Sequence, residues 1–291
     1  MSAAPSPPSG ARPPLRTRLA RALPWALGGG LLLGLLVMAL LADLIAPHPP
    51  NAFDLVADLQ PPGPGHWLGT DENGADLLSQ LIYGARVAVL VGLGTVSVCA
   101  TVGVTLGAIS GWYGGLVDEV LMRLIDVLMA FPGILLAILV IAITREPSIG
   151  AVVLALSLTG WAGYARLVRG QVLSLRNRPF VVAAQAMGAS APWIITRHLL
   201  PNVLAPVMVQ ATFGVAGAIL AEAGLSFLGL GPDGVPSWGA LLDQGARNFL
   251  ISGHLALWPG LAILLAVLGI NLLGDALRDA LDPHAAEGEG R

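Results

Sequence analysis

Long apolar segments, separated by short polar ones, constrain this chain more than any other feature. Residues 23–46, 86–111 and 202–228 are each long enough to cross a bilayer, since about 20 apolar residues span its hydrocarbon core. Hydrophobic residues make up 55% of the 291 residues and charged residues only 11%. With a mean hydropathy of +0.76, the chain is too apolar for a soluble domain. We therefore predict an all-α, polytopic membrane protein.

Six transmembrane helices are expected, at residues 23–46, 86–111, 118–143, 148–168, 202–228 and 255–273. This divides the chain into a disordered basic tail (1–22), a first membrane helix (23–46), an outer loop with a lead-in helix (47–82), a five-helix core (83–277) and a polar tail (278–291). A cleaved signal peptide is the alternative for the first helix. Its apolar region is longer than signal peptides use, and Pro47 follows it directly, so we favour an anchor.

The distribution of arginine predicts the orientation. All fifteen basic residues are arginine. Twelve fall on one side of the predicted spans and three on the other, which places both termini and the segment 176–202 in the cytoplasm. The first group contains Arg12, Arg16, Arg18, Arg21, Arg123, Arg166, Arg169, Arg176, Arg178, Arg197, Arg278 and Arg291, and the second Arg86, Arg145 and Arg247. The lack of lysine excludes a Walker A phosphate loop, so ATP would have to bind another chain.

Two spans have features that predict how they pack. Gly103, Gly107 and Gly111 recur every four residues, a spacing that lets two helices approach closely in lipid. The third span is interrupted at 131–133, where Pro132 should bend the helix. The single Cys99 lies in an apolar span, where a packing role is expected, and no disulfide can form within the chain.

The segment 180–202, between the fourth and fifth spans, is too broken to cross the membrane. Residues 180–187 are rich in alanine and predict a short helix that Gly188 ends. Two short helices flanked by arginines would suit a groove on another protein. From this segment alone, an amphipathic connector lying on the membrane surface is an equal alternative.

The second short helix has its own start and stop signals. Ser190 is expected to cap it, and Pro192 fits its first turn. Pro201 is expected to end this helix, and Asn202 to begin the next span.

This segment resembles the EAA loop of permeases of ATP-binding-cassette (ABC) importers, the element that docks into the ATPase subunit. The resemblance is carried by the alanine pair, the glycine and the ending 198–201, HLLP, whereas Val182 stands where the family usually has glutamate. It implies that the residues coupling this chain to an ATPase are Val182, Ala183, Ala184, Gly188, Ala189, Ser190, His198 and Pro201.

Three further blocks resemble C-type permeases of the dipeptide and oligopeptide family. They are 66–76 (HWLGTDENGAD), 222–231 (EAGLSFLGLG) and 271–283 (NLLGDALRDALDP). Together with the loop they occur in the family's order over residues 66–283. The resemblance implies a type I ABC importer permease fold, with the first helix peripheral.

Acidic residues outside these spans lead into the second one. Asn73 is a plausible cap of the lead-in helix, with Asp76 in its first turn. The carboxylates Asp71, Glu72 and Asp76 raise the alternative of a metal site, but acids capping a helix outside the membrane are the favoured interpretation. After the fifth span, Ser237 predicts the cap of a short helix that reaches Phe249.

Asp126 and Glu222 are the acids that could gate or line a path. For Asp126 the favoured interpretation is an ion pair with Arg123 near the inner face, and a gate or proton relay is the alternative. Glu222 either lines the path or contacts outside water at a helix end. No catalytic constellation is found, because 224–229 lacks the G-x-S-x-G spacing and the five histidines are scattered without H-E-x-x-H.

The resemblance implies an importer of peptides across a bacterial cytoplasmic membrane. This chain would be a transport subunit rather than an enzyme and would bind no cofactor, metal or nucleic acid. ATP and Mg²⁺ would sit on two partner ATPases, beside a homologous B-type permease and an outer solute-binding protein. Nickel chelates, glutathione or another small solute are alternative cargoes. A secondary transporter is disfavoured because the spans hold few ionisable groups, and a membrane scaffold would not need the exposed loop.

Overall fold

The computed structural model describes residues 15–54, 56–144 and 147–281. Regular structure in this part of the chain is helical, and only two isolated pairs, Gly63 with His66 and Thr70 with Asp76, bridge as strands do. The predicted all-α class is confirmed. The helices are α1 (Leu15–Leu40), α2 (Ala42–Ile45), α3 (Leu77–Tyr113), α4 (Gly115–Met129), α5 (Gly133–Ile143), α6 (Ile149–Leu175), α7 (Pro179–Ala186), α8 (Ala191–Ile194), a π-helical turn (Ile195–Leu199), α9 (Leu200–Phe227), α10 (Trp238–Arg247) and α11 (His254–Leu281).

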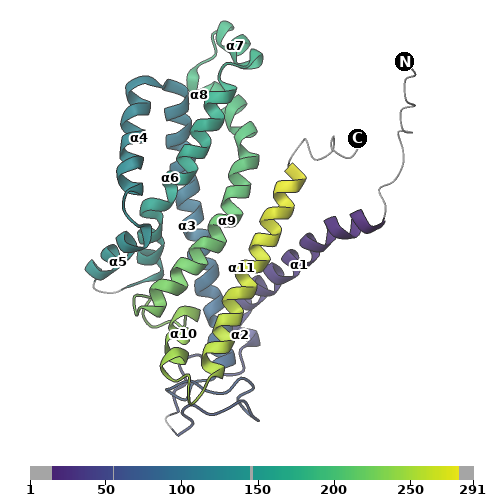
Figure 1. Ribbon diagram of the computed structural model, residues 1–291, viewed down its shortest axis with the longest axis vertical. Coiled ribbons are helices and arrows are strands. Elements are labelled where there is room, and N and C mark those ends of the chain that lie inside the picture. Colours follow the sequence, from purple (N-terminus) through teal and green to yellow (C-terminus); the bar gives the residue numbers. More distant parts are fainter. Residues whose placement is uncertain (1–14, 55, 145–146, 282–291) are drawn as a thin grey trace, which may run out of the picture.

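Helices α3, α6, α9 and α11 run along the length of the molecule, whereas α1 slants away from them (Figure 1). Helix α3 packs against α6 and α9, while α1 packs against α11. The short helix α7 lies at one end, which we call the α7 end, and α10 with the loops around it lies at the other, the α10 end (Figure 1). Five helices in the described residues are long and apolar enough to cross a membrane, and α4 with α5 makes six if the bent pair is one crossing.

The predicted glycine face forms the contact between α3 and α6. A Cβ on Gly103 would lie 2.5 Å from the Cβ of Tyr164, and one on Gly107 would lie 2.4 Å from the carbonyl oxygen of Ala165. At Gly111 the same atom would meet the Cβ of Val172 at 2.8 Å. These glycines therefore allow backbone approach that any side chain would prevent, as the small-residue spacing predicts.

The α10 end is closed by the tryptophan of α10. The Trp238 indole N–H donates to the carbonyl oxygen of Leu81 at 2.9 Å, and its ring fills the space above Gly84, where a Cβ would lie 2.6 Å from the ring. Ser237 caps α10, as predicted, by accepting from the Ala240 N–H at 3.2 Å. The short helix is thereby fixed against α3 and α9.

Several predicted helix boundaries are wrong. Helix α1 begins at Leu15, inside the predicted disordered tail, and α11 extends to Leu281. The first 14 residues, Arg145 and the polar end 282–291 lie outside the described residues. The third predicted span is two helices, α4 and α5, bent by 80° at a three-residue break. The interruption predicted at 131–133 is therefore confirmed, and Pro132 directly precedes α5.

Large apolar side chains cover much of the lateral surface. Leu90, Leu139, Leu154 and Leu264 are each more than half exposed. Such continuous apolar exposure is what lipid or partner helices cover in a membrane protein. It agrees with a chain that crosses the membrane several times.

Candidate functional site

The coupling segment, residues 176–202, forms a compact elbow at the α7 end (Figure 1). Pro179 starts α7 at a position where its missing N–H costs nothing. Gly188 then ends the helix with φ +84°, as predicted. The Gly188 N–H donates to the Gln185 carbonyl oxygen at 2.9 Å and the Ala189 N–H to that of Ala184 at 3.1 Å, the two bonds of a Schellman cap.

The second half of the segment differs from the prediction. Ser190 precedes α8 in extended conformation, but its side chain makes no capping hydrogen bond. Pro201 does not end a helix: it lies in the first turn of α9, which continues α8 through the π-helical turn. Residues 191–227 thus form one continuous 37-residue helix. A proline in the first turn lacks only an N–H that helix starts leave free, and the preceding π turn absorbs the local irregularity.

The elbow has an inner and an outer face. Val181, Ala184 and Ile194 are buried and pack with residues of α6 and α9, so the Ala184 side chain is not available to a partner. Val182 is 51% exposed and Met187 80% exposed, which gives the outer face an apolar surface.

His198 joins the two arms of the elbow. Its ring centroid lies 4.8 Å from that of Trp193, edge to face, and 6.1 Å from that of Phe180. Phe180 and Trp193 are both more than 40% exposed. His198 therefore positions the exposed rings of α7 and α8 together, a role its predicted place at a helix end did not reveal.

A cavity of about 280 Å³ lies between α3, α5, α6 and α9. Its lining is mostly apolar or glycine, with a few polar groups: Thr95, Cys99, Thr159, Tyr164 and Gln210. The Tyr164 hydroxyl donates to the Gln210 carbonyl oxygen at 3.3 Å. The sequence prediction missed this cavity, although polar residues inside apolar spans were the signal that could have found it.

The two acids predicted for a gate or path lie elsewhere. Asp126 pairs with Arg166 of α6, not with Arg123, whose guanidinium instead contacts Glu119 at 3.5 Å. The carboxylate of Asp126 is 64% exposed. Glu222 is 2% exposed and accepts from the Ser226 hydroxyl at 2.6 Å, so of its two alternatives the contact with outside water is wrong. Neither acid lines the cavity.

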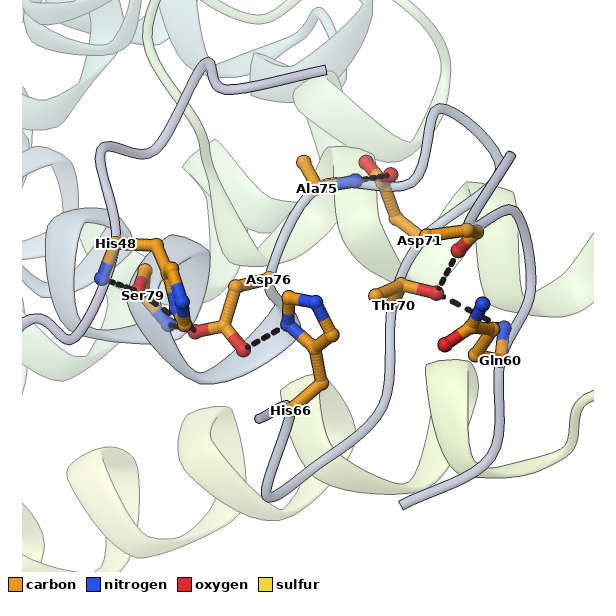
Figure 2. Close-up of polar contacts among 9 residues, drawn as sticks. His48, Gln60, His66, Thr70, Asp71, Ala75, Asp76 and Ser79 are labelled. Atoms are coloured by element: carbon orange, nitrogen blue, oxygen red, sulfur yellow. Dashed lines mark hydrogen bonds and ion pairs between the residues drawn. The ribbon is translucent and has the colours of Figure 1, made fainter. Parts of the chain in front are cut away.

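The predicted acidic block before α3 is built into a hydrogen-bonded loop at the α10 end (Figure 2). Asp71 is 1% exposed; one of its oxygens accepts from the backbone N–H groups of Asn73 and Ala75 at 2.8 Å, and the other from Gln80 at 2.7 Å. These bonds give Asp71 a structural role, in agreement with the preference for capping over metal binding.

Asp76, not Asn73, caps α3. Its carboxylate accepts from the Ser79 N–H at 2.9 Å. Burial opposes ionisation of this carboxyl group, but bonds from Ser79 and His66 outweigh it and hold the pKa of Asp76 below its ordinary value. His48 and His66, predicted to be scattered, both reach this carboxylate.

The chain matches two described families. Residues 103–287 match "Binding-protein-dependent transport system inner membrane component", and residues 24–62 match "N-terminal TM domain of oligopeptide transport permease C". The first match contains the coupling segment and the cavity-lining residues of α5, α6 and α9, but not those of α3.

Relatives with assigned names are transport permeases. The chain is 44% identical to the dipeptide transport system permease protein DppC of Alkalihalophilus pseudofirmus over 77% of this chain and 74% of that one. It is 44% identical to a putative peptide transport system permease protein of Brucella suis, covering 92% and 90%. It is 41% identical to the glutathione transport system permease protein GsiD of Pectobacterium atrosepticum, covering 89% and 86%.

A solved structure shares the fold. A chain of the inward-facing MetNI methionine ABC transporter superposes with a TM-score of 0.58 over 71% of this chain and 98% of that one, at 18% identity. The shared fold and the match over residues 103–287 therefore point to the same family of transport proteins. The chain belongs to the family of binding-protein-dependent transport system inner membrane components, the permease subunits of ABC importers.

Proposed function

We propose that this chain is one of two permease subunits of an importer that carries peptides across a bacterial cytoplasmic membrane. The observation that carries the proposal is the elbow at 176–202, with its exposed apolar outer face, on a chain 44% identical to a dipeptide permease. The partners would be a homologous B-type permease, two ABC ATPases holding ATP and Mg²⁺, and an outer solute-binding protein. This chain itself would carry no cofactor and catalyse no reaction.

Charge supports placing the α7 end in the cytoplasm. Arg176, Arg178 and Arg197 lie in the coupling segment, whereas Arg86 and Arg247 lie on α3 near α2 and on α10. Basic residues concentrate on the cytoplasmic side of membrane proteins. In this orientation both termini would lie in the cytoplasm, as the distribution of arginine along the sequence predicts.

The proposed mechanism is a mechanical coupling. Closure of the ATPases on nucleotide would move the elbow, and α8 continues without a break into α9, which lines the cavity. Movement of the elbow would therefore tilt α9 and change access to the cavity between inside and outside. Val182, Ala183, Gly188 and Met187 are exposed on the surface that would contact the ATPase.

Two measurements test this function. Affinity purification of the full chain from its host should recover two ATPase subunits, a second permease and a binding protein. Reconstituted with them, it should accumulate labelled dipeptide only with ATP. A complex that assembles but transports glutathione and no dipeptide would contradict the proposed peptide cargo. Purification that recovers no ATPase would contradict the proposed coupling.

A further inference from the structure

Two histidines and one aspartate meet at the first turn of α3 (Figure 2). His48 follows α2, His66 lies 18 positions later in the α2–α3 loop, residues 46–76, and Asp76 caps α3. One potential metal-binding atom from each of the three side chains lies within 4.8 Å of the other two. Nothing in the proposed transport function requires this convergence.

Only one of the two histidines is within hydrogen-bond distance of the carboxylate of Asp76. The His66 Nδ1 lies 3.0 Å from Oδ1 of Asp76, and the His48 Nδ1 lies 3.7 Å from Oδ2. Two ligand atoms of a tetrahedral zinc ion lie about 3.3 Å apart, since each is about 2.0 to 2.1 Å from the metal. The two separations, one to each oxygen of the carboxylate, lie on either side of this value.

His48 is the residue that hydrogen bonding leaves unsatisfied. Its Nδ1 is shielded from solvent and has no hydrogen-bond partner in the described part of the chain. The nearest acidic group, Oδ2 of Asp76, can only accept and is too far away for a hydrogen bond. A cation between this imidazole nitrogen and the carboxylate would satisfy both, because each can offer it a lone pair across the 3.7 Å that separates them.

The carboxylate is held in place by its surroundings. Oδ2 of Asp76 accepts from both the N–H and the hydroxyl of Ser79, at 2.9 and 2.7 Å. The same hydroxyl accepts from the backbone N–H of His48 at 3.0 Å. Ser79 therefore orients Asp76 and holds His48 beside it, which is the kind of support that ligands of metal sites receive from neighbouring groups.

We propose that His48, His66 and Asp76 bind a zinc ion. Two imidazoles and one carboxylate are typical zinc ligands, whereas Ca²⁺ and Mg²⁺ prefer oxygen ligands throughout. The side chains of His48 and His66 are 40% and 27% exposed, so the cluster lies close to solvent, which would supply a water molecule as the fourth ligand. On binding, His66 would adopt the tautomer with its single proton on Nε2, so that the Nδ1 lone pair goes to the metal in place of the hydrogen bond to Asp76.

The ion would fasten the α2–α3 loop to the start of α3. It would join positions 48, 66 and 76, which are far apart in sequence, and so restrict a loop that is otherwise held by hydrogen bonds. The expected role is structural, at the α10 end, and it is independent of the cargo and of the coupling segment.

A zinc titration of the full-length chain in lipid nanodiscs tests the site. The chain should carry an affinity tag without histidine, and Zn²⁺ alone is the probe, measured by competition with a chromophoric chelator and by mass spectrometry of the metal content. We expect saturation at one ion per chain and a rise in the unfolding temperature. Co²⁺ should give the visible absorption of a tetrahedral site.

Matched variants separate the ligands from the fold. His48→Gln, His66→Gln and Asp76→Asn should each weaken zinc binding by at least about 10-fold. Asparagine caps helices as well as aspartate does, so Asp76→Asn should keep α3 intact. The controls His198→Gln, at the α7 end, and Glu72→Gln, whose carboxylate contacts Arg247 and Asn248, should bind zinc as the parent does.

Two outcomes would overturn the proposal. One is zinc binding that is equal in the ligand variants and the parent. The other is stabilisation of the metal-free chain by acid with no effect of zinc, which would mean that a proton, rather than a metal, lies between His48 and Asp76.

Discussion

The guanidinium of Arg169 on α6 donates two hydrogen bonds to the carboxylate of Asp118 on α4, one of them from Nη2 at 2.6 Å. Asp118 also accepts from the hydroxyl of Ser110 on α3, so one carboxylate joins three helices. Helix α4 has only one buried residue, Ile125, and this polar contact is therefore a main part of its attachment.

Loss of this paired geometry should loosen α4. Arg169→Lys keeps the charge but cannot form the two-pronged contact, so we expect the free energy of unfolding in nanodiscs to fall by about 1–3 kcal/mol. The matched control is Arg123→Lys, whose parent side chain is 78% exposed, with an expected change below about 0.5 kcal/mol. Equal effects of the two substitutions would contradict a special role for the Asp118 contact.

Gly107→Ala should destabilise the chain through its backbone contact. The added Cβ would lie 2.4 Å from the Ala165 carbonyl oxygen, which is backbone and cannot rotate away. We expect a loss of about 1–3 kcal/mol in thermal unfolding. Gly29→Ala in α1, where nothing lies within 4 Å, should gain about 1 kcal/mol in helix propensity instead. A neutral Gly107→Ala would mean that α3 and α6 separate easily.

Gly188→Arg should abolish ATP-dependent uptake while the chain remains in the membrane. The position is exposed, and an added Cβ would meet no atom of the described residues within 4 Å, so we expect the obstruction to fall on the docked partner. Because the φ of Gly188 is +84°, any other residue strains the backbone there, and a second variant must measure the effect of that strain alone. Gly188→Asn suits that purpose, since asparagine adopts this conformation with less strain, and it should retain most uptake. Normal uptake by Gly188→Arg would count against docking at this turn.

Glu222→Gln should leave uptake unchanged. The Ser226 hydroxyl donates to Oε1 of Glu222, and a glutamine carbonyl oxygen accepts the same bond. Glu222→Ala removes the acceptor and leaves a buried gap, at an expected cost of about 1–3 kcal/mol in stability. Uptake that fails in Glu222→Gln while the unfolding temperature is unchanged would instead place this acid in the transport path.

Reversal of the Asp126 pair separates an ion pair from a gate. The side chains of Asp126 and Arg166 are 64% and 44% exposed. Loss of their ion pair in Asp126→Arg should therefore lower the free energy of unfolding by at most about 1 kcal/mol, and repulsion between the two arginines adds to this loss. The double variant Asp126→Arg with Arg166→Asp should restore both stability and uptake. A double variant that folds but does not transport would show that the carboxylate itself is needed at position 126.

The spans and their packing face could be predicted because their signals are local. A run of apolar residues predicts a membrane span, and a glycine at every fourth position predicts a packing face, whatever the rest of the fold is. The cap at Gly188 belongs to the same class, since a glycine after an alanine-rich turn is a strong stop. These features were correctly placed.

Helix ends and long-range partners could not be predicted so directly. Pro201 was expected to end a helix, but a proline suits a first turn equally well, and only the path of the chain distinguishes the two. Asp126 was paired with its sequence neighbour, whereas Arg166 is 40 positions away. His48 and His66 come together because of the path of an irregular loop, and the spacing of residues in the sequence does not predict that path.

The unbroken course of residues 191–227 has a geometric consequence. At 1.5 Å per residue, 37 residues make a rod about 55 Å long. Pivoting such a rod by about 5° around its midpoint carries each tip through an arc of about 2 Å, in opposite directions. A displacement of the helix end at one membrane face would thus be accompanied by an opposite displacement at the other face, because both ends belong to the same helical segment.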